Sequence, residues 1–124
     1  MYYYIEIIIF LQGANMNITQ QFNNSMLFEF YGNMLTEKQK NMLTDFLDNN
    51  LSLTEIAESY GVTRQAANDL IKRTLKLLDS YESKLGLLKR FNNIKDKVNA
   101  TITDIDAKKF EQAKDNLNSI LEDF

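Results

Sequence analysis

The stretch LTEIAESYGVTRQAANDLIK, residues 53–72, decides the fold of this chain of 124 residues. It fits a helix-turn-helix, in which two short helices cross steeply over a tight turn and each position demands a particular residue type. Ile56 is placed to point into the crossing, Ala57 is small enough for the second helix to pass over it, and Gly61 tolerates the positive φ of the turn. The remaining contact positions carry Tyr60, Val62, Ala67 and Leu70. The spacing therefore predicts a second helix with one side packed and the other side presented to a nucleic-acid groove.

The composition narrows the class of protein. The chain has no cysteine, no histidine and no proline, and 44% of its residues are hydrophobic, as expected of one folded domain. Without histidine or cysteine, the commonest metal ligands and acid-base groups are absent. The lone Asp104-x-Asp106 pair and Ser52 are better explained as solvated surface and a helix cap. We therefore expect an all-α protein that is not an enzyme and that holds no cofactor or metal.

Helix start and stop signals divide the first half of the chain. Residues 18–35 have apolar side chains at three- and four-residue intervals, and Gly32 ends or bends that helix. Thr36 and Gln39 form a capping-box pattern that opens the next helix, which Asn49 and Asn50 stop. Ser52 and Glu55 form a second capping-box pattern, which opens the first helix of the motif. Thr63 is the predicted cap of the second helix.

The second helix of the motif continues far beyond the turn. Its apolar residues alternate at three and four positions up to Gly86, which gives about 23 residues, or roughly 34 Å. They are Leu70, Thr74, Leu77, Tyr81, Leu85 and Leu88. This stripe can pack on the last helices of the chain, or it can pair with a second copy as a short coiled coil, giving a homodimer. Packing within the chain is favoured, because the heptad pattern lasts for only about three repeats.

The two ends of the chain differ from this middle. Residues 91–124 are weakly amphipathic and fit either a helix or helical hairpin covering the core, or a mobile partner-binding tail. Residues 1–15 form a short apolar run that contains Glu6 and lacks a basic start, so they fit neither a signal peptide nor a membrane span. We interpret them as a non-native or disordered extension ahead of a start at Met16. The helix-turn-helix domain is then expected at 16–90, with no membrane insertion and a cytoplasmic location by default.

Charge is distributed unevenly along the sequence. The net charge is −3, but residues 1–63 carry two Lys or Arg against seven Asp or Glu, residues 64–90 carry seven against three, and residues 91–124 carry five against seven. The positive block begins at the second helix of the motif. Local field governs the encounter with phosphate more than net charge does, so this asymmetry is compatible with nucleic-acid binding, while the acidic flanks keep non-specific affinity low.

Two longer stretches carry a family resemblance. LFEFYGNMLTEKQ at residues 27–39 and LSLTEIAESYGVTRQAANDLIKRTLKLLDSYESKLG at 51–86 resemble, in order and spacing, the YlxM family of bacterial proteins. That family looks like region four of bacterial sigma factors, an all-helical bundle with a helix-turn-helix. Its members are typically encoded beside the signal recognition particle GTPase and its receptor. The resemblance implies a regulatory role in the signal recognition particle pathway.

Eight residues are candidates for contact with nucleic acid: Thr63, Arg64, Gln65, Asn68, Asp69, Lys72, Arg73 and Lys76. Side chains at the start of a recognition helix reach base edges, where Arg suits guanine and Gln or Asn suits adenine. Thr63 and nearby backbone donors suit a phosphate, and the later basic residues suit contacts to the nucleic-acid backbone. Asp69 opposes close approach to phosphate unless a neighbouring cation neutralises it. The target is DNA or the RNA of the signal recognition particle, and a groove-filling helix favours DNA.

A second class of function is compatible with the same sequence. The helix-turn-helix can serve as a scaffold alone, with the protein docking on the signal recognition particle GTPase through its acidic helices or its C-terminal segment. Nucleic-acid contact remains the preferred hypothesis because the positive block coincides with the second helix of the motif.

Overall fold

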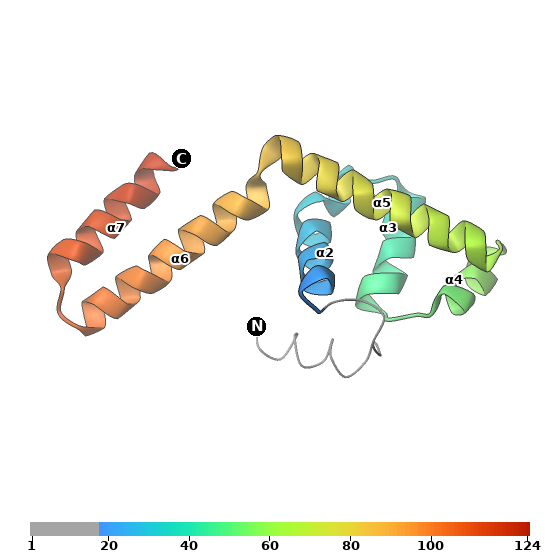
Figure 1. The fold of residues 1–124 in the computed structure, drawn as a ribbon, viewed down its shortest axis with the longest axis horizontal. Helices are drawn as coiled ribbons and strands as arrows, with labels where there is room; N and C mark the ends of the chain where they lie inside the picture. The colour runs from blue at the N-terminus through green and yellow to red at the C-terminus, as the bar shows by residue number, and fades with distance from the viewer. Residues whose placement is uncertain (1–17) are drawn as a thin grey trace. The chain divides into compact units, whose positions relative to one another are not determined.

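A computed structural model describes residues 18–124 and contains only helices and turns over that range. The α-helices are α2 Ile18–Tyr31, α3 Glu37–Leu43, α4 Leu53–Tyr60, α5 Arg64–Leu85, α6 Leu87–Asp106 and α7 Phe110–Glu122 (Figure 1). The predicted all-α class is confirmed. The predictions for residues 1–15 and for a start at Met16 lie outside the described residues.

The chain divides into two compact units between Leu85 and Gly86. The predicted extent of the helix-turn-helix domain, residues 16–90, stays a prediction. α6 begins at Leu87, directly after Gly86, whose φ of +63° lets the backbone leave one helix and enter the next within one residue. We refer to the two parts as the first unit and the second unit.

Local signals explain where the first helices end. α2 stops at Tyr31 and passes into a 3-10 turn, Gly32–Met34. A Cβ at Gly32 would lie 3.0 Å from Cε1 of Phe28, so a side chain here would press on the phenylalanine ring. The predicted end of this helix at Gly32 is confirmed by the change to a 3-10 turn. The close packing of the Phe28 ring is a second reason why a residue without a side chain is required at this position.

The predicted caps of α3 and α4 are present. The N–H of Thr36 donates to Oε1 of Gln39 at 3.0 Å, and the N–H of Gln39 donates to Oγ1 of Thr36 at 3.3 Å, which completes a capping box. At α4 the N–H of Glu55 donates to Oγ of Ser52 at 3.1 Å, so the hydroxyl cap is present. The return bond from the Ser52 N–H to the Glu55 side chain is not formed, so the predicted second box is only half right. α3 ends in a π-helical turn, Thr44–Asp48.

The core of the first unit lies where α5 packs against α2, α3 and α4 (Figure 1). Tyr31 is fully buried there: its hydroxyl donates to Oε1 of Glu82 at 2.6 Å, and its ring centroid lies 6.0 Å from that of Tyr81. On α5 itself, Thr74 and Leu78 are also buried.

The predicted apolar stripe of the long helix is only partly right, since Thr74 is buried but Leu85 is 50% exposed. The buried stripe of α5 runs through Ala67, Ile71, Thr74 and Leu78. This stripe packs on the earlier helices α2, α3 and α4. The predicted packing on the last helices and the predicted pairing with a second copy stay predictions.

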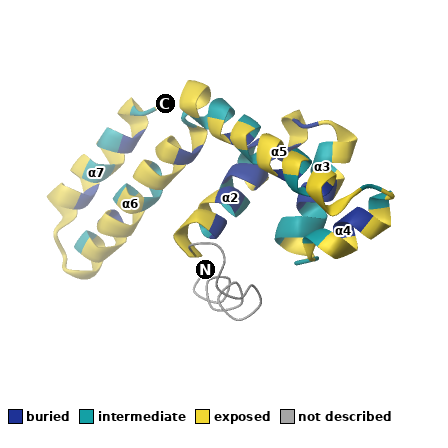
Figure 2. Ribbon diagram, turned by 45° about the vertical axis from the view of Figure 1, so that its right-hand side comes forward, coloured by how far each residue is buried: buried dark blue, intermediate teal, exposed yellow. Residues whose placement is uncertain are grey.

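The second unit is a hairpin of two antiparallel helices, α6 and α7, as predicted for this segment. The prediction that the hairpin covers the core stays a prediction. Nζ of Lys97 lies 2.8 Å from Oγ of Ser119 and 2.7 Å from Oδ2 of Asp123, and the amide of Asn116 donates to Oδ2 of Asp104 at 2.9 Å. Few of its side chains are buried, in contrast with the first unit (Figure 2). The buried residues of the hairpin are Leu88, Thr101, Ala113 and Ile120. None of the described helices has the length and hydropathy that a membrane span requires.

Candidate nucleic-acid interface

The turn between α4 and α5 has the geometry that the sequence predicts. Gly61 lies in the left-handed region with φ +64°, its N–H donates to the carbonyl of Glu58 at 3.3 Å, and the N–H of Val62 donates to the carbonyl of Ala57 at 3.0 Å. These two bonds form the Schellman motif, which closes a helix end with a left-handed residue. No atom lies within 4 Å of a Cβ built on Gly61, so the requirement for glycine comes from the backbone conformation alone.

Thr63 begins α5 as predicted, through its hydroxyl. The N–H of Ala66 donates to Oγ1 of Thr63 at 3.1 Å, and the N–H of Ala67 donates to its carbonyl at 3.0 Å. The hydroxyl oxygen therefore accepts one bond from the helix cap, and its own O–H remains a donor. The backbone N–H groups of Arg64 and Gln65 are further donors for a phosphate at this end, because the first turn of a helix offers them no acceptor.

The crossing between the two helices is filled by small and branched apolar side chains. Ile56, Ala57 and Ala67 are buried, as predicted from their positions. Ile71 is buried as well and had not been singled out, although its place four residues after Ala67 is the signal for it. The other predicted contact residues, Tyr60, Val62 and Leu70, are half-buried. This packing fixes the rotation of α5 about its own axis and hence which side faces outward.

Tyr60 also connects α4 to the π-helical turn, Thr44–Asp48, that precedes it. Its hydroxyl donates to Oδ2 of Asp45 at 3.0 Å, and the other carboxylate oxygen of Asp45 accepts from the amide of Asn49 at 3.0 Å. Burial of the phenol raises the pKa of Tyr60, and the hydrogen bond and charge of Asp45 add to that rise. The motif is therefore anchored on the first unit from both of its helices.

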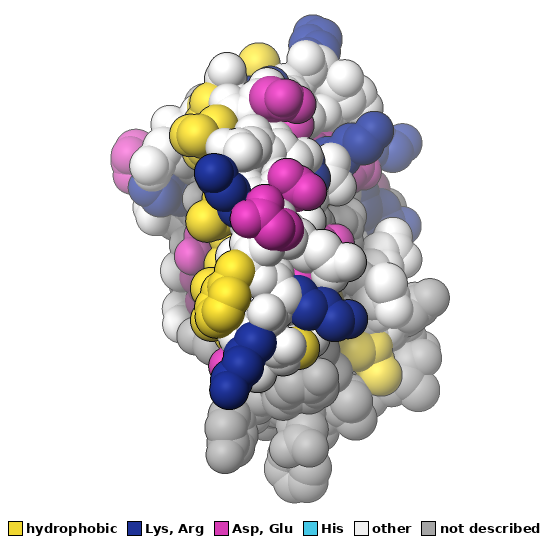
Figure 3. All heavy atoms as spheres, turned by 90° about the vertical axis from the view of Figure 1, so that its left-hand side faces the viewer, with side chains coloured by type: hydrophobic (Ala, Val, Ile, Leu, Met, Phe, Trp, Pro, Cys, Tyr) yellow, Lys and Arg dark blue, Asp and Glu magenta, His cyan; other side chains and the backbone are white. Residues whose placement is uncertain are grey.

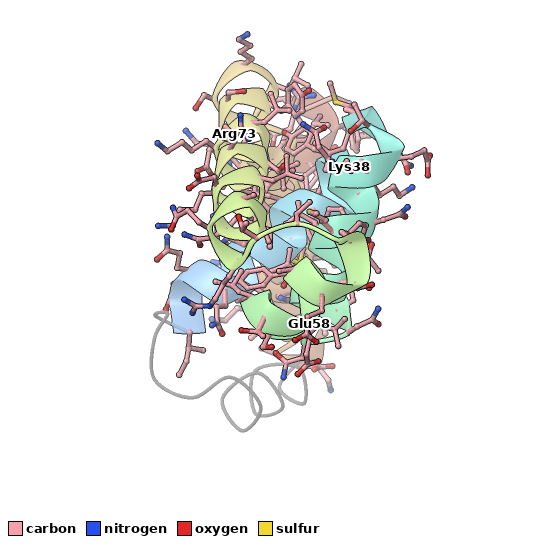
Figure 4. All side chains as sticks on the ribbon, turned by 90° about the vertical axis from the view of Figure 1, so that its right-hand side faces the viewer. Lys38, Glu58 and Arg73 are labelled. Carbon is pink, nitrogen blue, oxygen red and sulfur yellow. The ribbon has the colours of Figure 1, made fainter. Side chains whose placement is uncertain are left out.

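Seven of the eight candidate residues are exposed, and Asn68 is half-buried. Those on α5 recur at intervals of one, three and four residues, which places them along one side of the helix. That side lies opposite the buried stripe of Ala67, Ile71, Thr74 and Leu78. Figure 4 labels Arg73 on α5, with Glu58 on α4 and Lys38 on α3. The fold thus brings the predicted residues onto one face, which we call the α5 face.

Two of the candidate residues bind each other. The side-chain amide of Gln65 donates to Oδ1 of Asp69 at 3.0 Å, and Nε of Arg73 makes a long contact of 3.4 Å with the Asp69 carbonyl oxygen. This bond uses one of the two N–H donors of the Gln65 amide, so the other N–H and the carbonyl oxygen remain for contact with a base. Within residues 18–124, none of Arg64, Lys72, Arg73 and Lys76 forms an ion pair, so their charges remain available to phosphate.

The helix before the turn, α4, carries exposed negative charge close to the candidate residues. α4 exposes the carboxylates of Glu55 and Glu58, the second of which is labelled in Figure 4. In a bound helix-turn-helix the first helix crosses the nucleic-acid backbone, so carboxylates here oppose phosphate. The excess of Asp and Glu over Lys and Arg in residues 1–63 is the sequence feature that predicts this opposing charge. Elsewhere in the described part of the chain, no group of three or more His, Cys, Asp or Glu side chains is arranged to hold a metal ion.

Comparison with known proteins gives one consistent match. A family profile described as "Putative helix-turn-helix protein, YlxM / p13 like" matches residues 18–119. The UPF0122 protein YlxM of Bacillus subtilis is 54% identical over 54 residues, which is 44% of this chain and 48% of that protein. A UPF0122 protein of Desulforamulus reducens is 51% identical over 47 residues, or 38% of this chain and 40% of that protein.

A third relative matches over a longer stretch. The UPF0122 protein lwe1821 of Listeria welshimeri is 42% identical over 77 residues, which is 60% of this chain and 69% of that protein. For the Bacillus and Desulforamulus relatives, the chain spans less than half of their length.

Proposed function

The chain belongs to the UPF0122 family of YlxM- and p13-like helix-turn-helix proteins, and from that premise we propose that it is a regulatory protein that binds nucleic acid through the α5 face. The observation that carries the proposal is the coincidence of three properties on one side of one helix. The side is exposed, it starts at the left-handed turn of the motif, and it carries four basic side chains without ion-pair partners among the described residues.

Each part of the α5 face suits a different contact. Arg64 and Gln65 occupy the first turn of α5, where side chains of a recognition helix reach base edges. Lys72, Arg73 and Lys76 lie two to three turns further along and suit phosphates that flank the groove. Asn68 is half-buried, so it is less accessible to a base than its neighbours.

We propose duplex DNA as the preferred target and the RNA of the signal recognition particle as the alternative nucleic acid. A helix presented along its whole side fits the major groove of B-form DNA, whereas the major groove of A-form RNA is too narrow to admit it. The carboxylates of Asp69, Glu55 and Glu58 reduce the general attraction to phosphate. Binding is therefore expected to depend on a specific site more than on charge alone.

The cellular role that we propose is regulation within the signal recognition particle pathway, in the cytoplasm. Its support is the family resemblance of residues 27–39 and 51–86. A second candidate keeps the same pathway but makes the protein a docking module on the GTPase of the particle, with the helix-turn-helix as a scaffold. The observation in its favour is the mixed charge around the motif, where exposed carboxylates accompany the basic residues of the α5 face.

Binding of the full chain to labelled duplex DNA and to the particle's RNA, across a salt series, tests the nucleic-acid proposal. Lys72→Ala should weaken binding to all sequences and lower the dependence of the affinity on salt by about one phosphate contact, whereas Arg64→Ala should weaken binding mainly to the preferred sequence and so relax specificity. Lys114→Ala is the matched control, because Lys114 is an exposed cation on α7 outside the α5 face. Glu58→Gln should strengthen binding at low salt.

The outcomes separate the two candidate functions. Loss of affinity in the two α5 variants, with Lys114→Ala unchanged, supports the α5 face. No binding at low salt, or equal effects of all three alanine variants, overturns the nucleic-acid proposal. Retention of the GTPase by the immobilised chain would then favour docking.

A further inference from the structure

We propose that a second copy of this chain covers the exposed apolar side of the second unit, so that two hairpins form an antiparallel four-helix bundle. The surface consists of Val98, Ile102 and Ile105 on α6 with Phe110, Leu117 and Leu121 on α7, which are between 41% and 70% exposed. We call it the hairpin face. The inference does not rest on nucleic-acid binding, because the α5 face contributes nothing to it.

The hydrogen bonds within the hairpin fix the direction in which this face points. Lys97 on α6 binds Ser119 of α7, and Asp104 on α6 binds Asn116 of α7, so these positions mark the sides where the two helices meet. Val98, Ile105 and Leu117 each follow one of these positions by a single residue, a rotation of roughly 100°. Because the helices are antiparallel, the same step turns both stripes toward one side of the hairpin.

The residues of the hairpin face therefore form one surface rather than two separate ridges. In Figure 3, where the hairpin lies nearest the viewer, exposed hydrophobic side chains gather in a strip beside the charged ones. An aromatic side chain buries roughly 150–250 Å² and the aliphatic ones bury less, so the six partly exposed residues offer on the order of several hundred Å² per copy. A standard protein interface buries about 800 Å² per partner, so the remaining area of a dimer interface would come from the polar rim of this face.

The small size of the second unit is a reason to expect that its hairpin face is buried against another copy of the chain. It spans Gly86–Phe124, which is 39 residues, and the chain has no cysteine to staple it. Units below about 40 residues usually need disulfides, metals or oligomerisation to be stable. Within residues 18–124 no cluster of metal-ligating side chains is present. Oligomerisation is the remaining route of these three.

The distribution of charged residues in the second unit indicates that the hairpin face binds the hairpin of a second copy. The second unit carries seven Lys or Arg and seven Asp or Glu, so its total charge favours neither a nucleic acid nor an anionic membrane. Along α6 the charges separate: residues 89–97 hold four basic and one acidic side chain, and residues 98–106 hold two acidic and no basic ones. Two copies of α6 that run antiparallel place each basic half beside an acidic half, and a parallel pair places like charges together.

Sedimentation of the full chain over a concentration series tests the dimer. We expect the mass of two chains at high concentration, with Ile102→Asp raising the dissociation constant at least tenfold. Met34→Asp is the matched control, because Met34 lies in the first unit and is 52% exposed, against 53% for Ile102. A wild-type chain that stays monomeric, or equal effects of the two aspartates, overturns the proposal and leaves the face to a different protein or to the first unit.

A single cysteine tests the orientation without a destabilising charge. Val98 lies near the middle of α6, so an antiparallel pair brings it close to its own counterpart. Because the chain has no cysteine, Val98→Cys should form a disulfide-linked dimer under mild oxidation, while Met34→Cys should not. Equal cross-linking of both variants, or none with Val98→Cys, excludes the antiparallel arrangement. Neither result depends on nucleic acid, so failure here is distinguishable from failure of the α5 face.

Discussion

The two units use their apolar side chains in opposite ways. In the first unit Leu27, Leu43, Ile56 and Leu78 are almost completely buried, and the charged residues of α5 face outward. In the second unit side chains such as Leu117 and Leu121 remain largely exposed along the hairpin. The α5 face is therefore a polar surface that is supported by a buried core. The hairpin face is an apolar surface that remains exposed to solvent in a single copy of the chain.

The largest expected difference is the response to leucine truncation in the two units. Leu78→Ala removes a fully buried side chain from α5 and should lower the free energy of unfolding by about 2–5 kcal/mol. Leu117→Ala, whose side chain is 49% exposed, should cost less than about 1 kcal/mol in dilute protein. Urea unfolding followed by circular dichroism measures both. Similar costs for the two substitutions would remove the contrast between the units.

A smaller effect is expected at the turn of the helix-turn-helix. Gly61→Ala forces a side chain into a left-handed conformation with φ +64° and should cost about 1–2 kcal/mol. Gly61→Asn should cost less, because asparagine tolerates this conformation. Thermal unfolding of the three proteins tests the order wild type, Asn, Ala. An alanine variant as stable as the wild type would show that the turn relaxes without strain.

The end of α6 offers the reverse substitution. Lys108 has φ +60° and closes α6 with the same pair of bonds, from its N–H to Ile105 at 3.0 Å and from the N–H of Lys109 to Asp104 at 2.7 Å. Lys108→Gly should therefore stabilise the second unit by about 0.5–1 kcal/mol, since relief of strain exceeds the entropy that glycine adds to the unfolded chain. Amide hydrogen exchange in α6 and α7 should slow. Faster exchange would contradict the assigned strain.

The smallest predicted effect concerns Asp48 at the end of the π-helical turn. Partial burial of this carboxylate, and then the charge of Glu29, raise its pKa above the ordinary value. The folded state therefore favours the protonated form, and stability falls as pH rises through the raised pKa. Asp48→Asn should stabilise the first unit at neutral pH by less than about 0.5 kcal/mol, because the residue is only partly buried and solvent screens most of the effect. The gain should vanish below the ordinary pKa of aspartate.

Much of the first unit was predictable because its boundaries depend on short-range chemistry. Thr36, Gly61 and Thr63 each act on backbone groups within four residues, so their roles follow from sequence spacing alone. The bond between Tyr31 and Glu82 joins residues 51 positions apart and leaves no local pattern. Gln21 and Asn24 are buried polar residues of α2, and a reading based on hydrophobic periodicity cannot place them inside.

The α5 face was predictable for the same reason, since the register of one helix fixes which residues share a side. The bond from Gln65 to Asp69 does not follow from this register, because helix spacing does not fix the rotamers of two exposed side chains. The start of α6 directly after Gly86 has no separate sequence signal either, since a glycine is typical of the end of the preceding helix. A left-handed residue ends one helix and can start the next.

The link between Tyr31 and α5 has a consequence for synthesis on the ribosome. α2 cannot complete its packing until Glu82, its hydrogen-bond partner, has been translated. At that point almost the whole second unit is still to be made, and its 39 residues take roughly 2–8 seconds at the usual elongation rate of about 5–20 residues per second. Helix formation and collapse of a small domain are far faster than this. The newest residues are still enclosed by the exit tunnel of the ribosome, so α5 becomes free to pack on α2 only after much of the hairpin has been added, and the core of the first unit forms late in synthesis.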